Sequence, residues 1–159
     1  MKKIFLLPIA MFLCTLHINA QVNIISSIES GNSKQLMSWI SDGHDVNTPV
    51  EVKGVKMNIL SLAAKMGNPE MVDVLLKKGA NAKAKTDNVD ALMYAAESGN
   101  KEVVNLLIQA GADVTLERAD GMTAKDLAVN KGNKEVANIL AEEMNNKIQA
   151  ARMARAKKK

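Results

Sequence analysis

Few of the residues that usually perform catalysis or bind metal ions occur in this chain. Its 159 residues include one cysteine, Cys14, and two histidines, His17 and His44. A serine or cysteine nucleophile needs a base within hydrogen-bond reach, and a cysteine and histidine zinc site needs more ligands than these unless carboxylates complete it. The adjacent acids Glu142 and Glu143 are explained by a solvated acidic surface. We therefore expect no enzyme activity, no metal and no other cofactor.

The N-terminal segment has the organisation of an export signal. Lys2 and Lys3 form a basic start, an apolar stretch follows over residues 4–16, and small residues end the segment at Ala20. An uncleaved membrane anchor is the alternative, but the stretch is short against the ~20 residues that cross a bilayer. We predict a signal peptide over residues 1–20, cleavage near Ala20, and a periplasmic or secreted product of a bacterial cell. That product lacks cysteine and keeps one histidine.

The charge is distributed unevenly along the predicted product. Residues 147–159 carry six basic side chains and no acid, whereas residues 21–146 carry 13 basic and 17 acidic side chains. The pattern predicts a basic C-terminal tail on a mildly acidic body. Weak contact with an anionic membrane or envelope polymer is one role for the tail, and a solubilising or docking role is the other. The tail contains no aromatic residue, which argues against nucleic-acid binding.

The elements that must position any functional residue repeat along the chain. Four glycines are each followed by asparagine, at spacings of 36, 32 and 33 residues, and a second glycine lies 12 residues after each of the first three. Aromatic residues are only 3% of the chain, so the core must consist of Leu, Ile, Val, Ala and Met, as in packed helices. The Gly-Asn pairs begin at Gly31, Gly67, Gly99 and Gly132, and the second glycines are Gly43, Gly79 and Gly111.

Each Gly-Asn pair predicts the start of a helix. The asparagine side chain accepts a hydrogen bond from free amides of the first turn, which makes Asn32, Asn68, Asn100 and Asn133 candidate N-caps. Apolar residues recur five, eight and nine positions after the glycine, as at Val72, Leu75 and Leu76, and form one helical stripe. The second glycine ends three of these helices. The fourth unit has Met144 at that place, so its helix is expected to run on towards the basic tail.

Two stretches carry a motif that resembles the ankyrin repeat. They run from Leu60 to Asn68 and from Leu92 to Asn100, and each is completed by Gly-Ala-Asn or Gly-Ala-Asp after the second helix. The resemblance implies an all-α fold: an ankyrin-repeat solenoid of about four helix-turn-helix units with finger loops and an extended C-terminal helix. The domain covers residues 21–146, with units of approximately 21–49, 53–84, 85–117 and 118–146, followed by the basic tail 147–159.

The chain departs from the family pattern at several positions. Asn58 and Asp90 replace the family threonine, so we expect the usual threonine hydrogen bonds to be rearranged. Asn88 replaces a turn glycine, which is reasonable because asparagine tolerates left-handed geometry. The segment from His44 to Asn58 is three residues longer than usual and should lengthen the first finger loop.

The resemblance also implies a function, which is recognition of a protein partner along a concave surface of finger-loop tips and first helices. We expect a monomer that binds or shields an unidentified protein, either as an accessory factor or as a toxin-neutralising immunity protein, with no nucleic-acid partner. The family's variable contact positions carry over to Glu29, Ser30, Val55, Met57, Lys65, Met66, Thr86, Asp87, Val89, Glu97, Ser98, Ala119, Asp120, Met122, Asn130 and Lys131.

Several of these residues also have a plainer interpretation. The three methionines adapt to varied apolar surfaces, but each is equally an ordinary exposed or gap-filling residue. Trp39 lies on a helical stripe and is expected to pack in the core. Tyr94 aligns with apolar positions of other units, so partial burial and contact with a partner both remain open. His44 is expected to be solvated.

Overall fold

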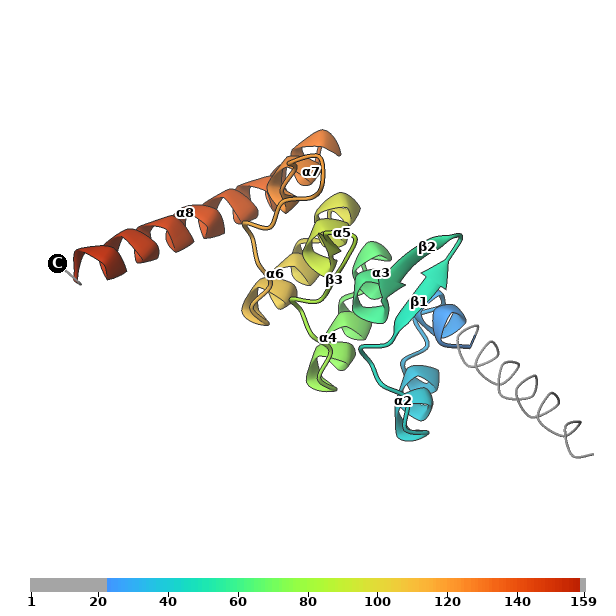
Figure 1. Cartoon of the computed structure of the whole chain (residues 1–159). Helices are drawn as coiled ribbons and strands as arrows, with labels where there is room; N and C mark the ends of the chain where they lie inside the picture. The colour runs from blue at the N-terminus through green and yellow to red at the C-terminus, as the bar shows by residue number, and fades with distance from the viewer. Residues whose placement is uncertain (1–22, 158–159) are drawn as a thin grey trace, which may run out of the picture.

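The computed structural model describes residues 23–157, which form antiparallel helix pairs stacked in two layers (Figure 1). Residues 23–29 are helical and precede α2. The later helices are paired in chain order. Hairpins precede the α3–α4 and α5–α6 pairs, and a loop with a single bridge between Glu117 and Thr123 precedes the α7–α8 pair. The helices are α2 (Ser33–Ser41), α3 (Ile59–Lys65), α4 (Pro69–Lys77), α5 (Ala91–Ser98), α6 (Lys101–Gln109), α7 (Ala124–Asn130) and α8 (Lys134–Ala156). The predicted all-α solenoid with an extended last helix is confirmed. The signal peptide predicted over residues 1–20 lies outside the described residues.

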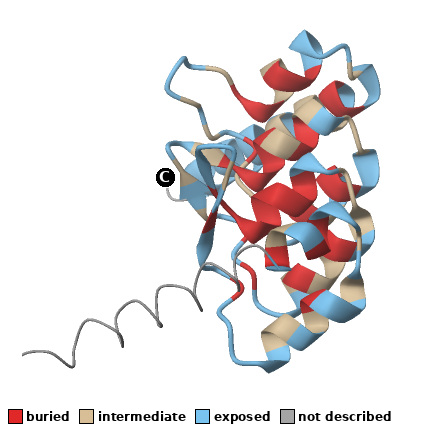
Figure 2. Cartoon of the chain, turned by 90° about the vertical axis from the view of Figure 1, so that its right-hand side faces the viewer, coloured by how far each residue is buried: buried red, intermediate tan, exposed pale blue. Residues whose placement is uncertain are grey.

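One layer contains α3, α5 and α7, and the other contains α2, α4, α6 and α8. Each layer packs along its length through neighbouring helices, and the two members of a pair pack across the layers. In the first layer the residues at the interfaces are small, because Ala63, Ala64, Ala95 and Ala96 are all fully buried. In the second layer the same role is taken by leucines. Leu36, Leu75, Leu107 and Leu140 are each completely buried, so one apolar seam connects all four units (Figure 2).

Helices α3, α5 and α7, which are the first helices of three pairs, each begin at a polar residue that caps them. The Asn58 side chain accepts a hydrogen bond from the Ser61 amide at 2.7 Å, and Asp90 accepts one from the Met93 amide at 2.9 Å. Thr123 forms a capping box with Asp126. The Asn58 amide group also donates to the Ala84 carbonyl at 3.3 Å. Asparagine and aspartate therefore keep the capping role at the two positions where threonine is replaced.

Three of the four predicted asparagine caps on the second helices are confirmed. Asn32, Asn68 and Asn100 accept hydrogen bonds from amides of the first helical turn. Asn133 is the N-cap residue of α8, as predicted, but the expected side-chain hydrogen bond to the first turn is absent. Its amide nitrogen donates instead to the carbonyls of Ala96 and Glu97, at 2.8 and 3.1 Å. This asparagine connects two repeats because its donors are turned towards the preceding pair.

Two antiparallel hairpins form the first two finger loops. Strands β1 (Pro49–Val52) and β2 (Val55–Asn58) pair over four residues, and β3 (Lys85–Thr86) and β4 (Val89–Asp90) pair over two. Lys53 and Gly54 in the first turn, and Asp87 and Asn88 in the second, all have positive φ, as a type I′ turn requires. The predicted lengthening of the first finger loop and the left-handed conformation of Asn88 are both confirmed.

The single tryptophan packs against the core at the start of the stack, as predicted. Trp39 is half-buried, and its ring stacks on the His44 ring with centroids 4.7 Å apart and planes 16° apart. His44 is exposed, as expected, but its outer position also covers the indole. The pair closes the apolar seam at α2.

Candidate partner-binding surface

The positions predicted to contact a partner lie mainly on the finger loops and at the ends of α3, α5 and α7. These elements belong to consecutive units, so the surface is continuous only because the helix pairs stack. Residues about 30 positions apart in the chain become neighbours by this route. The candidate binding surface is defined here as the accessible residues among those predicted positions, together with Tyr94 and Arg118.

Tyr94 lies at the centre of this surface. The Lys65 ammonium group, on α3, lies 5.6 Å from the centroid of the Tyr94 ring on α5. At this distance the cation is attracted to the face of the ring. Burial raises the pKa of the Tyr94 hydroxyl, and the negative charge of Glu97 raises it further, while Arg118 acts in the opposite direction. The ring is thus half-buried among side chains of both charges from three units.

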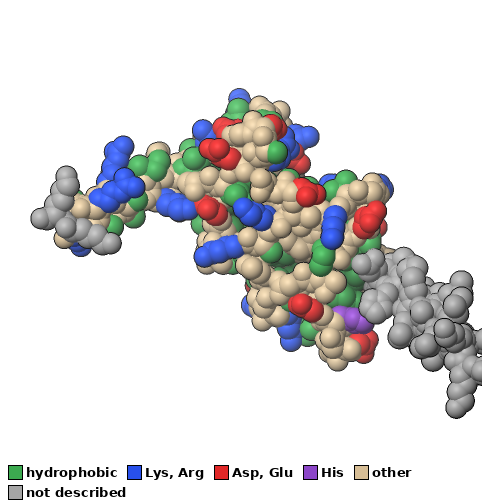
Figure 3. Space-filling model, viewed as in Figure 1, with side chains coloured by type: hydrophobic (Ala, Val, Ile, Leu, Met, Phe, Trp, Pro, Cys, Tyr) green, Lys and Arg blue, Asp and Glu red, His purple; other side chains and the backbone are tan. Residues whose placement is uncertain are grey.

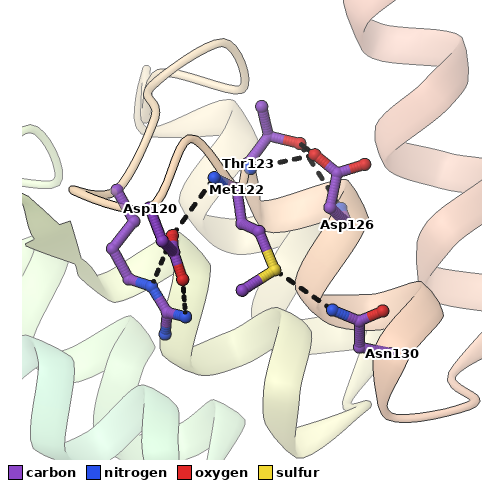
Figure 4. A network of polar contacts seen from close by, with 6 residues as sticks. Asp120, Met122, Thr123, Asp126 and Asn130 are labelled. Carbon is purple, nitrogen blue, oxygen red and sulfur yellow. Dashed lines mark hydrogen bonds and ion pairs between the residues drawn. The ribbon is translucent and has the colours of Figure 1, made fainter.

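The third finger loop is tied down by side-chain bonds (Figure 4). Arg118 makes an ion pair with Asp120, which holds the pKa of that carboxyl at about 2. The Asp120 carboxylate also accepts a hydrogen bond from the Met122 amide at 3.2 Å. The Met122 sulfur in turn lies 3.1 Å from the side-chain amide of Asn130 on α7. The structure therefore brings three predicted contact residues, Asp120, Met122 and Asn130, into one network.

Exposed apolar side chains accompany these polar groups. Val55 at the tip of the first hairpin is 46% exposed, and Met66 at the end of α3 is 48% exposed. An unbranched thioether adapts its shape to different apolar surfaces. The basic members are Lys65, Arg118 and Lys131, and the acidic members are Glu29, Asp87, Glu97 and Asp120. Such a mixture of apolar, aromatic and oppositely charged groups is suited to contact with another protein.

Met57 does not belong to this surface, and the prediction that it contacts a partner is wrong. It is the cross-strand partner of Val50 in the first hairpin, and the two side chains are only 1% and 2% exposed. Residues directly opposite one another in an antiparallel pair share one face of the ribbon. That face is turned towards the core, so Met57 packs in the interior while Val55, on the same strand, stays exposed.

The other predicted positions are at least partly accessible. Glu29 and Ser30 are exposed before α2, but the Ser30 hydroxyl donates to the Ser26 carbonyl at 2.7 Å. The Ser98 hydroxyl likewise donates to the Ala95 carbonyl at 2.9 Å. Exposed positions are Glu29, Ser30, Val55, Lys65, Met66, Asp87, Ser98, Ala119, Asp120, Asn130 and Lys131, and half-buried ones are Thr86, Val89, Glu97 and Met122.

Two residues of the surface were not among the predicted contacts. For Tyr94 the predicted partial burial is confirmed, because its ring is half-buried beneath Lys65, and its contact with a partner stays a prediction. Arg118 was missed altogether. It lies at the base of the third finger loop, and only its ion pair with Asp120, two residues on, indicates its place on the surface.

Among residues 23–157, no three His, Cys, Asp or Glu side chains gather closely enough to hold a metal ion. In the same part of the chain, none of the helices combines the length and the apolar character needed to cross a bilayer.

Stacked helix pairs joined by projecting hairpins define a repeat protein of the solenoid class. A family model for ankyrin repeats, in three copies, matches residues 24–118, which is more than half of the chain. The chain therefore belongs to the ankyrin repeat family, whose members generally mediate protein–protein interactions. The pair α7–α8 begins beyond residue 118 and adds a further unit at the C-terminal end. Comparison with curated proteins gives no match.

Proposed function

We propose that this ankyrin repeat protein is a non-catalytic binding module of the cell envelope, which as a monomer binds or shields a partner protein through the candidate binding surface. The observation that carries the proposal is the arrangement around Tyr94. The Lys65 ammonium group of one unit lies over the Tyr94 ring of the next, the charge of Arg118 from a third unit acts on the Tyr94 hydroxyl, and the half-exposed Met66 follows Lys65 directly. A contact built in this way depends on the folded stack and needs no reactive group.

The proposed interaction combines apolar packing against the partner with charged groups that orient it. Aromatic, methionine and arginine side chains are enriched where protein interfaces are most strongly bound. Tyr94 and Met66 would supply apolar contact area, and the charged groups around them would orient the partner. The Arg118–Asp120 ion pair and the Met122–Asn130 contact hold the neighbouring loop in place before binding, which lowers the entropy lost in the complex.

The proposed location rests on the N-terminal segment, with its two lysines, its apolar stretch and the small residues before Gln21. N-terminal sequencing of the protein recovered from cell fractions tests it. A periplasmic or secreted product beginning near Gln21 is expected. A cytoplasmic protein that retains Met1 or Lys2 contradicts the proposed location and leaves the proposed binding surface untouched.

Capture of a partner from envelope extract tests the function, with two matched variants. Met66→Asp places a charge on the binding surface, and Val129→Asp places one at another exposed apolar residue. Val129 lies 33 positions after Ala96, which is the spacing of one repeat, so the two residues are equivalent. Ala96 is buried inside the stack, whereas Val129 is 58% exposed at its C-terminal end. Met66→Asp should lower capture by about fivefold or more, since central apolar contacts contribute more than about 1 kcal/mol. Val129→Asp should leave capture unchanged. Equal effects of the two variants on capture would contradict the proposed binding surface.

Capture together with a survival assay distinguishes two kinds of partner. An accessory factor should co-purify constitutively with its enzyme. An immunity protein should be required for survival only when a toxin is delivered. Either kind of partner is consistent with the proposed surface, provided that Met66→Asp weakens capture of the partner and Val129→Asp does not.

A further inference from the structure

The last helix extends well beyond the stack that it belongs to (Figure 1). Within α8 the last fully buried side chain is Leu140, Met144 is half-buried, and residues 145–157 are all exposed. Lys147 fixes the point at which the helix leaves the stack. Its ammonium group donates to the Asp113 carboxylate at 2.5 Å and to the Thr115 hydroxyl at 3.3 Å. The segment that follows, residues 148–157, is called the α8 extension below.

The α8 extension presents basic side chains and no acidic ones. It contains Arg152, Arg155 and Lys157, and Lys158 and Lys159 follow it in the sequence. Lys147 is already paired with Asp113, so the extension itself carries the charge that remains available. On the side of the molecule seen in Figure 3, lysine and arginine but no aspartate or glutamate occupy the projecting part.

One face of the extension combines apolar and basic groups. Ile148, Arg152 and Arg155 are spaced by four and three residues, so they lie on the same side of the helix. Ile148 is 43% exposed, and Ala151 lies between it and the arginines along that side. Met153, which is 65% exposed, is five residues from Ile148 and therefore does not extend this stripe.

We propose that the α8 extension attaches to the surface of an anionic lipid bilayer. A run of basic residues at the surface of such a membrane is attracted by its negative potential. Arginine stems can lie along the headgroup region while the guanidinium groups bond to phosphate, and Ile148 enters the boundary of the acyl chains. The small apolar area makes this attachment electrostatic and reversible. The extension lies on the bilayer and does not span it.

The alternatives fit the extension less well. A helix that docks in an apolar protein groove presents apolar anchors at positions i, i+3 or i+4, and i+7, but the residues four and seven positions after Ile148 are both arginine. Single-stranded nucleic acid is held by aromatic side chains on which bases stack, and no aromatic residue occurs in α8. Because the extension projects from the end of the stack, membrane attachment leaves the candidate binding surface free for its partner.

Vesicle binding by the full chain tests this proposal. Vesicles of phosphatidylcholine alone are compared with vesicles that contain 30% phosphatidylglycerol, in 0.1 M and 0.5 M salt. We expect binding to the anionic vesicles in low salt, with loss in high salt because the charges are then screened. The apolar N-terminal segment, where retained, would bind both vesicle types and carries the basic Lys2 and Lys3, so variants of the extension must show its own share of the binding.

Two triple variants separate the extension from the net charge of the protein. Neutralising Arg152, Arg155 and Lys157 to glutamine should weaken binding to anionic vesicles by about a hundredfold, since each basic residue near such a surface contributes about fivefold. Neutralising Lys34, Lys56 and Lys78, which are exposed on the body, should leave binding within about twofold. Circular dichroism checks that both variants stay folded.

Three outcomes would overturn the proposal. These are equal binding to neutral and anionic vesicles, equal losses in the two triple variants, and capture of an acidic protein or of DNA through the extension by a chain that does not bind anionic vesicles. None of these outcomes bears on partner capture through Met66, so failure here is distinguishable from failure of the proposed function.

Discussion

The side-chain amide of Asn100 donates a hydrogen bond of 2.9 Å to the main-chain carbonyl of Gly67, across the boundary between two helix pairs. The carbonyl of the same side chain accepts bonds from the Glu102 and Val103 amides at 3.0 and 3.1 Å. One asparagine therefore begins its own helix and joins it to the preceding unit. Asn133 makes only the bond to the preceding unit, and Asn32 makes only the capping bond to its own helix.

This difference predicts unequal costs for removing the asparagines. Asn32→Ala removes a cap and should lower the free energy of unfolding by about 1 kcal/mol. Asn100→Ala removes a cap and an inter-repeat hydrogen bond, so the loss should be about 2 kcal/mol. Urea denaturation of both variants measures the difference. Equal losses would show that the bond between Asn100 and Gly67 adds nothing to stability.

Asp90 is a buried acid, and its replacement by asparagine should stabilise the protein at neutral pH. Burial raises the pKa of Asp90 above its usual value of 3.8, although the Met93 amide favours the charged form. Because the folded pKa is the higher one, the stability contributed by this group is fully present below pH 3.8 and is lost as the pH rises through the folded pKa. Asp90→Asn keeps the cap, as Asn58 does in the preceding unit, and removes the buried charge.

The measurement is a set of unfolding curves for wild type and Asp90→Asn between pH 3 and 7. The variant should be the more stable protein at pH 7, and its advantage should shrink as the pH falls towards 3.8. An advantage that is independent of pH, or a variant less stable at pH 7, is inconsistent with a desolvated carboxylate at this position.

Lys147 sets the pKa of Asp113. The ammonium group of Lys147 and the hydroxyl and amide of Thr115 lower this pKa from 3.8 to about 2. Lys147→Gln should therefore raise it towards 3.8, and carbon-13 NMR titration of the carboxyl group measures the change. In wild type the stabilisation by this pair is present above pH 3.8 and is lost as the pH falls towards 2. Asp120, paired with Arg118, should stay at about 2 in both proteins. A pKa of Asp113 that is unchanged in the variant would show that Lys147 of α8 does not pair with this carboxylate.

Two positions on strand β2 should respond in opposite ways to the same substitution. Met57→Asp places a charge in the core, and we expect it to lower the free energy of unfolding by more than about 3 kcal/mol or to prevent folding. Val55→Asp, at a side chain that is 46% exposed, should change stability by less than about 0.5 kcal/mol. Thermal unfolding of the two variants measures both effects. Comparable destabilisation would place Val55 in the core together with Met57.

The helices and their ends could be predicted from the sequence because the signals are local. An asparagine after glycine caps a helix through atoms only three residues away, as Asn32, Asn68 and Asn100 do. The fate of Asn133 could not be predicted in this way. Its amide bonds to carbonyls 36 and 37 residues earlier, so its role depends on how one helix pair stacks on the previous one.

The candidate binding surface could be predicted in outline from positions within the repeat, but the same reasoning gave a wrong prediction at Met57. Finger-loop and helix-end positions recur with the repeat, and all but one of those predicted are accessible. The first hairpin is longer than the second, and its Val50–Met57 pair turns inward against the core. Which face of a strand is buried follows from pairing and packing together. Position within a repeat does not determine it.

The contact between Lys65 and Tyr94 was also beyond local reasoning, because it joins side chains 29 positions apart. Each residue has an ordinary alternative in the sequence, as a solvated lysine and as a packed tyrosine. Only the stacking of α3 on α5 makes them the centre of one surface.

Site-specific photo-crosslinking tests the central claim most directly. A crosslinking residue is placed at position 66 or at position 129 of the full chain in cells of the source organism, and adducts are identified by mass spectrometry. Capture of a protein partner by the candidate binding surface predicts one dominant protein adduct from position 66 and none from position 129. The account would be contradicted by an adduct that forms from position 129 alone, or equally from both positions.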